Sequence, residues 1–81
     1  MAPSQSYVLV NVDVGTESRI INELKNVPEV AEAWAVYGVY DIVVKVKADN
    51  PDELKKIVLE RIRKIEGVRS TLTLIPIEGF P

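Results

Sequence analysis

Apolar and polar side chains alternate in three segments of the chain, and a period of two residues is typical of β-strands. These segments are residues 7–14, 41–47 and 68–75. A fourth apolar segment, residues 30–37, contains alanines that blur the alternation, so we predict a strand there without assigning its faces. The hydrophobic pattern therefore predicts four strands.

Two further segments have the period of an amphipathic helix. In "GTESRIINELKN" the apolar stripe is Ile20, Ile21 and Leu24, with Thr16 at the expected N-cap and Pro28 beyond the end. The second segment, "DNPDELKKIVLERIRKIEG", has stronger start and stop signals. Asn50 is the expected N-cap, Pro51 the first helical residue and Gly67 the C-terminal stop. Its predicted buried stripe is Leu54, Ile57, Val58, Ile62 and Ile65.

The order strand, helix, strand, strand, helix, strand consists of two βαβ halves. Right-handed crossovers in both halves give a ferredoxin-like α+β fold, βαββαβ, with a four-stranded antiparallel sheet and both helices on one face. We expect a single domain over residues 1–81, with residues 1–6 and 77–81 as tails.

Composition excludes several kinds of chemistry. The chain has no cysteine and no histidine, which removes disulfides, thiolate or imidazole metal sites and a Ser-His triad. We therefore expect no cofactor and no metal. The net charge of −2 lacks the cationic excess of a nucleic-acid binder. No secretion signal or membrane-spanning run is present, so we expect a cytoplasmic protein with no direct nucleic-acid or membrane partner.

One face of the predicted sheet has no helix to cover it. We predict that the helices cover the face with Val8, Val10, Val12, Ile42, Val44, Val46, Leu72 and Leu74. The opposite face then carries Tyr7, Leu9, Val43 and Ile75. Either Lys45, Lys47 and Arg69 shield these side chains, or two copies pair sheet against sheet; we favour the dimer.

The turn between the second and third strands has an unusual sequence, "VYGVYD". If Tyr37 and Tyr40 pair across a two-residue loop, Gly38 occupies the position where a type II′ turn needs positive φ. Turn geometry alone accounts for Gly38, and capping of turn amides accounts for Asp41. The residues leave open whether the turn also holds a ligand.

Other functional classes receive less support from the residues. An RNA-recognition module stacks bases on aromatic side chains, whereas the outer face of the third strand offers Val43, Lys45 and Lys47. A small dimeric ferredoxin-like enzyme acting on a carboxylic or aromatic metabolite is the alternative. Its acid or base would have to be Asp13, Asp41, a glutamate, a lysine or a tyrosine, since histidine is absent. No carboxylates cluster at catalytic spacing, so we expect no catalytic residues. Acidic residues interleave with Lys55, Lys56, Arg61, Arg63 and Lys64, which favours a solvated helix face.

The segments "AVYGVYDIVVKV" and "IEGVRSTLTLI" together resemble the effector-binding (RAM) domain of the Lrp/AsnC family of transcriptional regulators. The resemblance covers residues 7–75. It implies a non-enzymatic domain that binds a free amino acid or similar small effector. It also implies dimers formed through the sheet, which assemble into octamer- or decamer-like rings.

The resemblance also implies roles for particular residues. Effectors of the family bind between dimers near the turn, where Gly38 would let an effector approach the backbone and Asp41 would pair with its ammonium group. The same resemblance implies that Tyr37 and Tyr40 wall the site and that Ser70, Thr71 and Thr73 supply hydroxyls. Only six residues precede the first predicted strand, so we expect no DNA-binding domain in this chain. Co-assembly with full-length Lrp/AsnC regulators is therefore a further expectation.

Overall fold

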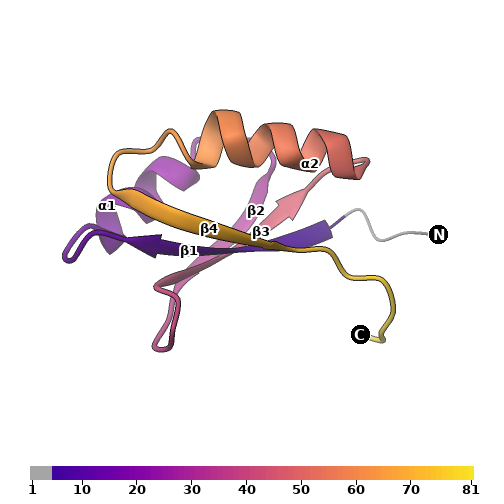
Figure 1. The fold of residues 1–81 in the computed structure, drawn as a ribbon, viewed down its shortest axis with the longest axis horizontal. Coiled ribbons are helices and arrows are strands. Elements are labelled where there is room, and N and C mark those ends of the chain that lie inside the picture. Colours follow the sequence, from indigo (N-terminus) through magenta and orange to yellow (C-terminus); the bar gives the residue numbers. More distant parts are fainter. Residues whose placement is uncertain (1–4) are drawn as a thin grey trace.

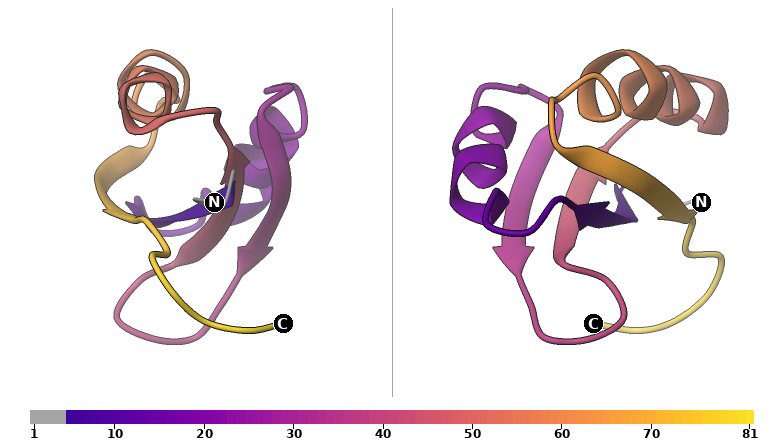
Figure 2. Two further views of the ribbon diagram at one scale, coloured as in Figure 1. Left: turned by 90° about the vertical axis from the view of Figure 1, so that its right-hand side faces the viewer. Right: turned by 60° about the vertical axis from the view of Figure 1, so that its left-hand side comes forward.

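The computed structural model describes residues 5–81. Along the chain they form β1 (Gln5–Val12), α1 (Glu17–Leu24), β2 (Val30–Ala35), β3 (Ile42–Lys47), α2 (Pro51–Ile57), the π-helical turn η1 (Val58–Ile62) and β4 (Val68–Leu74). The strands form one antiparallel sheet in the order β2-β3-β1-β4. Both helices lie on the same side of this sheet (Figure 1, Figure 2). The predicted ferredoxin-like fold is confirmed.

The hydrophobic core lies between the sheet and the helices. The predicted helix stripes supply much of it, because Ile20 and Leu24 of α1 and Leu54 and Ile57 of α2 are buried. The strands contribute alternate valines and one isoleucine: Val8, Val10, Val12, Ile42, Val44 and Val46. These pack as the pattern of apolar positions predicts for β1 and β3.

Several predicted boundaries were wrong by a few residues. β1 begins at Gln5 and ends at Val12, whereas residues 7–14 were predicted. Gln5 and Ser6 therefore belong to the sheet and not to a tail, and the rest of the predicted N-terminal tail lies outside the described residues. β2 ends at Ala35, two residues early.

The largest error concerns β4, whose side chains face the opposite way from the prediction. Leu72 pairs with Leu9, and Leu74 pairs with Tyr7, so both leucines lie on the uncovered face. Thr71 and Thr73 pair with Val10 and Val8 and therefore point toward the helices. The prediction that Leu72 and Leu74 face the helices was wrong.

A register shift at the start of β4 explains the error. Val68 pairs with Val12, but Ser70 pairs with Asn11, so one step along β1 corresponds to two steps along β4. Such a bulge adds a residue to one strand, here Arg69, and reverses the facing of everything after it. Val68 packs against the core as expected. A strict alternation counted from Val68 then assigns every later side chain of the strand to the wrong face of the sheet. Ile75, which follows β4, lies beside Leu54 on the helix side, so its predicted place on the open face was also wrong.

β2, in the first half of the fold, contains a bulge like the one in β4. In β2, Val30 pairs with Val46 while Glu32 pairs with Lys45, so Ala31 is the extra residue. Val30, like Val68, packs against the core. This bulge accounts for the blurred alternation of β2 in the sequence.

The second helix begins as predicted and then widens. The side chain of Asn50 accepts a hydrogen bond from the Glu53 N–H at 2.8 Å. From Val58 the hydrogen bonding changes, and the Arg63 N–H donates to the Val58 carbonyl five residues back at 2.8 Å. Such π-turns are rare in proteins as a whole. Those that do occur often lie at functional sites. Within residues 5–81, neither helix has the length and apolar character needed to cross a membrane.

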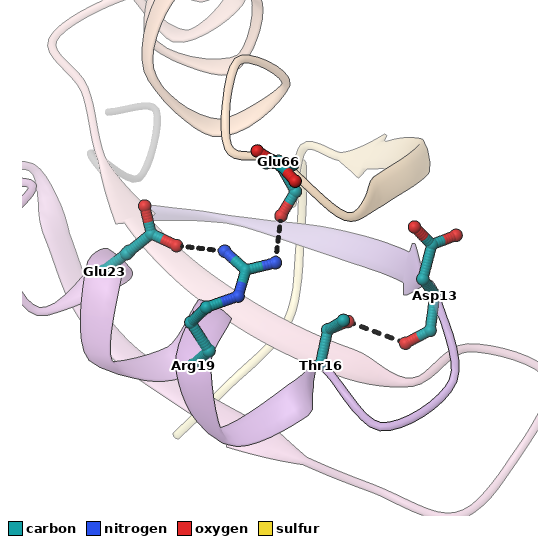
Figure 3. A network of polar contacts seen from close by, with 5 residues as sticks. All are labelled: Asp13, Thr16, Arg19, Glu23 and Glu66. Atoms are coloured by element: carbon teal, nitrogen blue, oxygen red, sulfur yellow. Dashed lines mark hydrogen bonds and ion pairs between the residues drawn. The ribbon is translucent and has the colours of Figure 1, made fainter.

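Arg19 joins the N-terminal turn of α1 to the segment before β4 (Figure 3). Its guanidinium donates to the Glu66 carbonyl at 2.6 Å and pairs with Glu23 one turn along the helix. The Thr16 hydroxyl donates to the Asp13 carbonyl and makes no side-chain cap with the helix, although Thr16 is at the predicted N-cap. Gly67, which follows Glu66, has a φ of +101°, and a Cβ there would lie 2.9 Å from Arg19 Nη2.

Replacing Gly67 with alanine is expected to destabilise the fold. The left-handed backbone should lower the free energy of unfolding by about 1–3 kcal/mol, and the end of the Arg19 side chain would have to shift to make room for the added Cβ. Gly79→Ala is the control, because Gly79 lies in the C-terminal tail and has no neighbour within 4 Å. Thermal unfolding measures both variants; equal melting temperatures for Gly67→Ala and wild type would contradict this account.

Candidate functional site

The uncovered face of the sheet carries a continuous apolar row across all four strands. Trp34 of β2 pairs with Val43 of β3, Val43 with Leu9 of β1, and Leu9 with Leu72 of β4. Trp34 keeps 63% of its surface exposed and Leu72 45%. With Tyr7 and Leu74 in the next row, these six residues are called the open face below. The sequence pattern did not place Trp34, Leu72 and Leu74 in this set, because the two bulges hide the orientation of these side chains.

A polar group borders the open face at its β2 edge. Glu32 accepts a hydrogen bond from the Trp34 indole N–H at 3.0 Å, and its other oxygen lies 3.5 Å from Lys45 Nζ. The indole hydrogen bond and, after it, the Lys45 charge hold the pKa of Glu32 below its ordinary value of 4.5. Glu32 is therefore ionised at neutral pH and offsets the charge of Lys45 beside the apolar row.

The connection between β2 and β3 is a four-residue loop, so the predicted two-residue hairpin was wrong. The Val36 N–H donates to the Asp41 carbonyl at 3.0 Å, and Tyr37 to Tyr40 form the loop. Gly38 has positive φ, 152°, as predicted. Tyr37 and Val39 are almost completely exposed, and the loop projects on the side of the sheet away from the helices (Figure 1, Figure 2).

Asp41 attaches this loop to β1. Its backbone N–H donates to the Val10 carbonyl at 3.0 Å, and its carboxylate Oδ2 accepts from the Val12 N–H at 2.8 Å. The carboxylate thus continues the β1–β3 ladder past its last paired residues, Val10 and Ile42. This contact gives Asp41 a structural role in the single chain.

The structure separates the remaining predicted ligand residues. Ser70 lies on the uncovered side of the sheet, where the Asn11 side chain donates to its hydroxyl at 3.4 Å. Thr71 and Thr73 lie on the other side, under the second helix. The concavity that Thr71 and Thr73 line includes none of residues 37–41.

Thr71 and Thr73 instead line a groove of about 370 Å³ between the second helix and β4. The helix lines it with Pro51, Leu54, Lys55, Val58, Leu59 and Arg63, and the strand side adds Ile75. The groove therefore combines aliphatic walls, two hydroxyls and two cations, and its size suits a metabolite as small as an amino acid.

The helix residues of this groove were not predicted from the sequence, because the charge pattern placed Lys55 and Arg63 on a solvated face. One signal was available. Lys55, Leu59 and Arg63 are spaced four residues apart, so they form one line along the helix, and Leu59 is apolar outside the buried stripe. An apolar residue between two cations at this spacing indicates that this line of the helix contacts something other than solvent.

The structure is that of a ferredoxin-like α+β domain with an exposed apolar sheet face and a groove beside its second helix. The chain belongs to the Lrp/AsnC ligand-binding domain family, whose model matches residues 5–80. The crystal structure of FFRP-DM1 is 36% identical, with a TM-score of 0.84 over 95% of this chain and 100% of that one. The HTH-type transcriptional regulator FL11 of Pyrococcus furiosus is 36% identical over 70 residues, covering 86% of this chain and 46% of the regulator.

The chain spans about half the length of the curated regulators it matches. A Neisseria meningitidis transcriptional regulator, solved as a complex with L-Met, shares the fold with a TM-score of 0.83 at 16% identity, over 95% of this chain and 51% of that one. A homocitrate synthase of Sulfurisphaera tokodaii is 46% identical over 54 residues, which are 67% of this chain but only 12% of the enzyme. A match to so small a part of the enzyme carries no argument for its activity in this chain. The Pyrococcus furiosus proteins PF0250 and FL11, which match this chain, are HTH-type transcriptional regulators.

Proposed function

We propose that this chain is a non-catalytic domain that binds a small carboxylic effector, an amino acid or a related acid, and assembles through its open face. The observation that carries the proposal is that the two sides of β4 belong to two different surfaces. One side of this strand presents Leu72 and Leu74 to the open face, and the other side presents Thr71 and Thr73 to the groove. Because the two surfaces share one strand, a ligand in the groove lies one residue away from side chains of the open face.

The open face supports a symmetric dimer on energetic grounds. Tyr7, Trp34, Leu72 and Leu74 each keep roughly half of their surface exposed. Covering them contributes about 3–6 kcal/mol per copy, taking roughly 1.5–3 kcal/mol for complete burial of one such side chain. Two copies together therefore only match an association cost of about 4–15 kcal/mol. A dimer of this kind depends on every large side chain of the face.

Replacing Leu72 with aspartate is expected to dissociate the dimer. An unpaired carboxylate buried at the interface should raise the dissociation constant by at least about a hundredfold. Val14→Asp is the control, because Val14 is a fully exposed apolar residue that belongs neither to the open face nor to the groove. Sedimentation at micromolar concentration measures both. A wild-type chain that sediments as a monomer, or a Leu72→Asp variant that remains dimeric, would contradict the proposal.

The groove is the proposed effector site, and a neighbouring dimer completes it. The loop with Tyr37, Gly38 and Tyr40 projects from each protomer. We propose that this loop, contributed by a second dimer, closes the groove of the first. An amino-acid effector also needs a counter-charge for its ammonium group, and Asp41 of that neighbouring copy is the residue proposed for it. The L-Met complex of the Neisseria relative supports an amino acid as one candidate class.

A ligand that fills the groove is expected to raise the melting temperature. At one hundred times its dissociation constant it adds about 2.7 kcal/mol, which shifts a domain of this size by on the order of ten degrees. The panel consists of the twenty amino acids and the 2-oxo acids that correspond to them. The double variant Thr71→Val, Thr73→Val keeps the side-chain shape but loses both hydroxyls, so it should lose most of the shift. Absence of any shift across the panel would contradict the effector role.

Further assembly is the last part of the proposal. Octamer- or decamer-like rings are proposed for the dimers, and mixed assemblies with full-length Lrp/AsnC regulators are proposed as the route to transcription. The family membership supports this, because relatives that are regulators carry the same domain. Mixing the chain with such a regulator should produce mixed species in native mass spectrometry; only homo-oligomers of each would contradict co-assembly.

A further inference from the structure

The charges around the groove between the second helix and β4 are all of one sign. Lys55 and Arg63 line it from the helix, and no aspartate or glutamate of residues 5–81 lines it. Neither cation takes part in an ion pair within that part of the chain, where the acidic partners bind Arg19, Lys45, Arg61 and Arg69 instead. The groove therefore presents two cations available to an anion.

Other concavities of the molecule differ in this respect. The one between α1 and β2 includes Glu32, and the one beside the C-terminal tail includes Glu78. The carboxylate of Asp41 lies outside the groove and already accepts a hydrogen bond from the Val12 N–H. A protomer therefore offers a carboxylate ligand two counter-charges in the groove and offers an ammonium group none.

The rest of the lining fits an uncharged ligand body. Leu54, Val58, Leu59 and Ile75 supply aliphatic contacts, and the hydroxyls of Thr71 and Thr73 can donate to carbonyl or carboxylate oxygens. A primary ammonium group in the same place gains no carboxylate partner from its own protomer. The Asp41 proposed for it belongs to a neighbouring copy, and one oxygen of that carboxylate already accepts the Val12 N–H, so the ammonium group regains less of its lost hydration than the carboxylate does. The chemistry of the groove thus distinguishes an amino acid from the acid in which a carbonyl replaces its amino group.

We propose that the groove prefers aliphatic 2-oxo acids to the amino acids of the same carbon skeleton. Lys55 and Arg63 bind the carboxylate, the threonine hydroxyls donate to the oxo group, and the aliphatic residues of the helix contact the side chain of the ligand. This inference rests on the proposed effector function and narrows its ligand class.

Isothermal titration of the full 81-residue chain with two matched ligands tests the preference. The ligands are 4-methyl-2-oxopentanoate and L-leucine, which share their carbon skeleton and differ at one position. The oxo acid is expected to bind at least tenfold more tightly. Lys55→Gln and Arg63→Gln should each weaken its binding about tenfold or more, because each removes a charged hydrogen-bond donor.

Lys56→Gln is the control for the loss of a positive charge. Lys56 is adjacent in sequence but lies in a different concavity, with Glu53 and Glu60, so its loss should leave the dissociation constant unchanged. Equal or tighter binding of leucine would overturn the preference and leave the effector function intact. Binding of neither ligand nor any other acid would overturn both. Equal losses in all three glutamine variants would overturn the assignment of Lys55 and Arg63.

Discussion

Two extra residues in the edge strands, Ala31 in β2 and Arg69 in β4, determine what each face of the sheet presents. Each lies one position after a valine that packs against the core, so both strands enter the sheet in the same way and then reverse their facing. Without Arg69, Leu72 and Leu74 would face the second helix and the threonines would face outward. The bulge exchanges them, and it thereby creates both surfaces on which the proposed function depends.

The two surfaces are separated by the thickness of a single strand. Leu72, on the open face, lies between Thr71 and Thr73, which line the groove. A ligand that shifts β4 relative to the helix therefore acts directly on residues that a partner copy would contact. The π-turn of the second helix lies opposite this stretch of β4, between Lys55 and Arg63, and it is the irregular part of an otherwise regular layer. This arrangement gives a physical route from effector binding to assembly that requires no moving domain.

The sequence predicted the fold because periodicity and caps are local signals. The alternation in β1 and β3, the helix stripes and the Asn50 cap all have the expected roles in the structure. The facing of β4 could not be predicted in the same way, since a bulge depends on pairing with β1 and leaves the local pattern unchanged. The loop was misjudged for a similar reason: Asp41 binds Val10 and Val12 of a strand distant in the sequence, and this pairing lengthens the loop to four residues. The helix side of the groove was missed because charged residues on a helix surface usually indicate only solvent.

The division of β4 between two surfaces is the central claim, and methyl NMR of the assigned protein tests it most directly. Addition of 4-methyl-2-oxopentanoate should shift the methyl resonances of Thr71, Thr73 and Val58 first, whereas dilution of the protein should shift those of Leu9, Leu72 and Leu74. Ligand shifts centred on Leu72 and Leu74, or dilution shifts centred on Thr71 and Thr73, would contradict the orientation of β4 and the function derived from it.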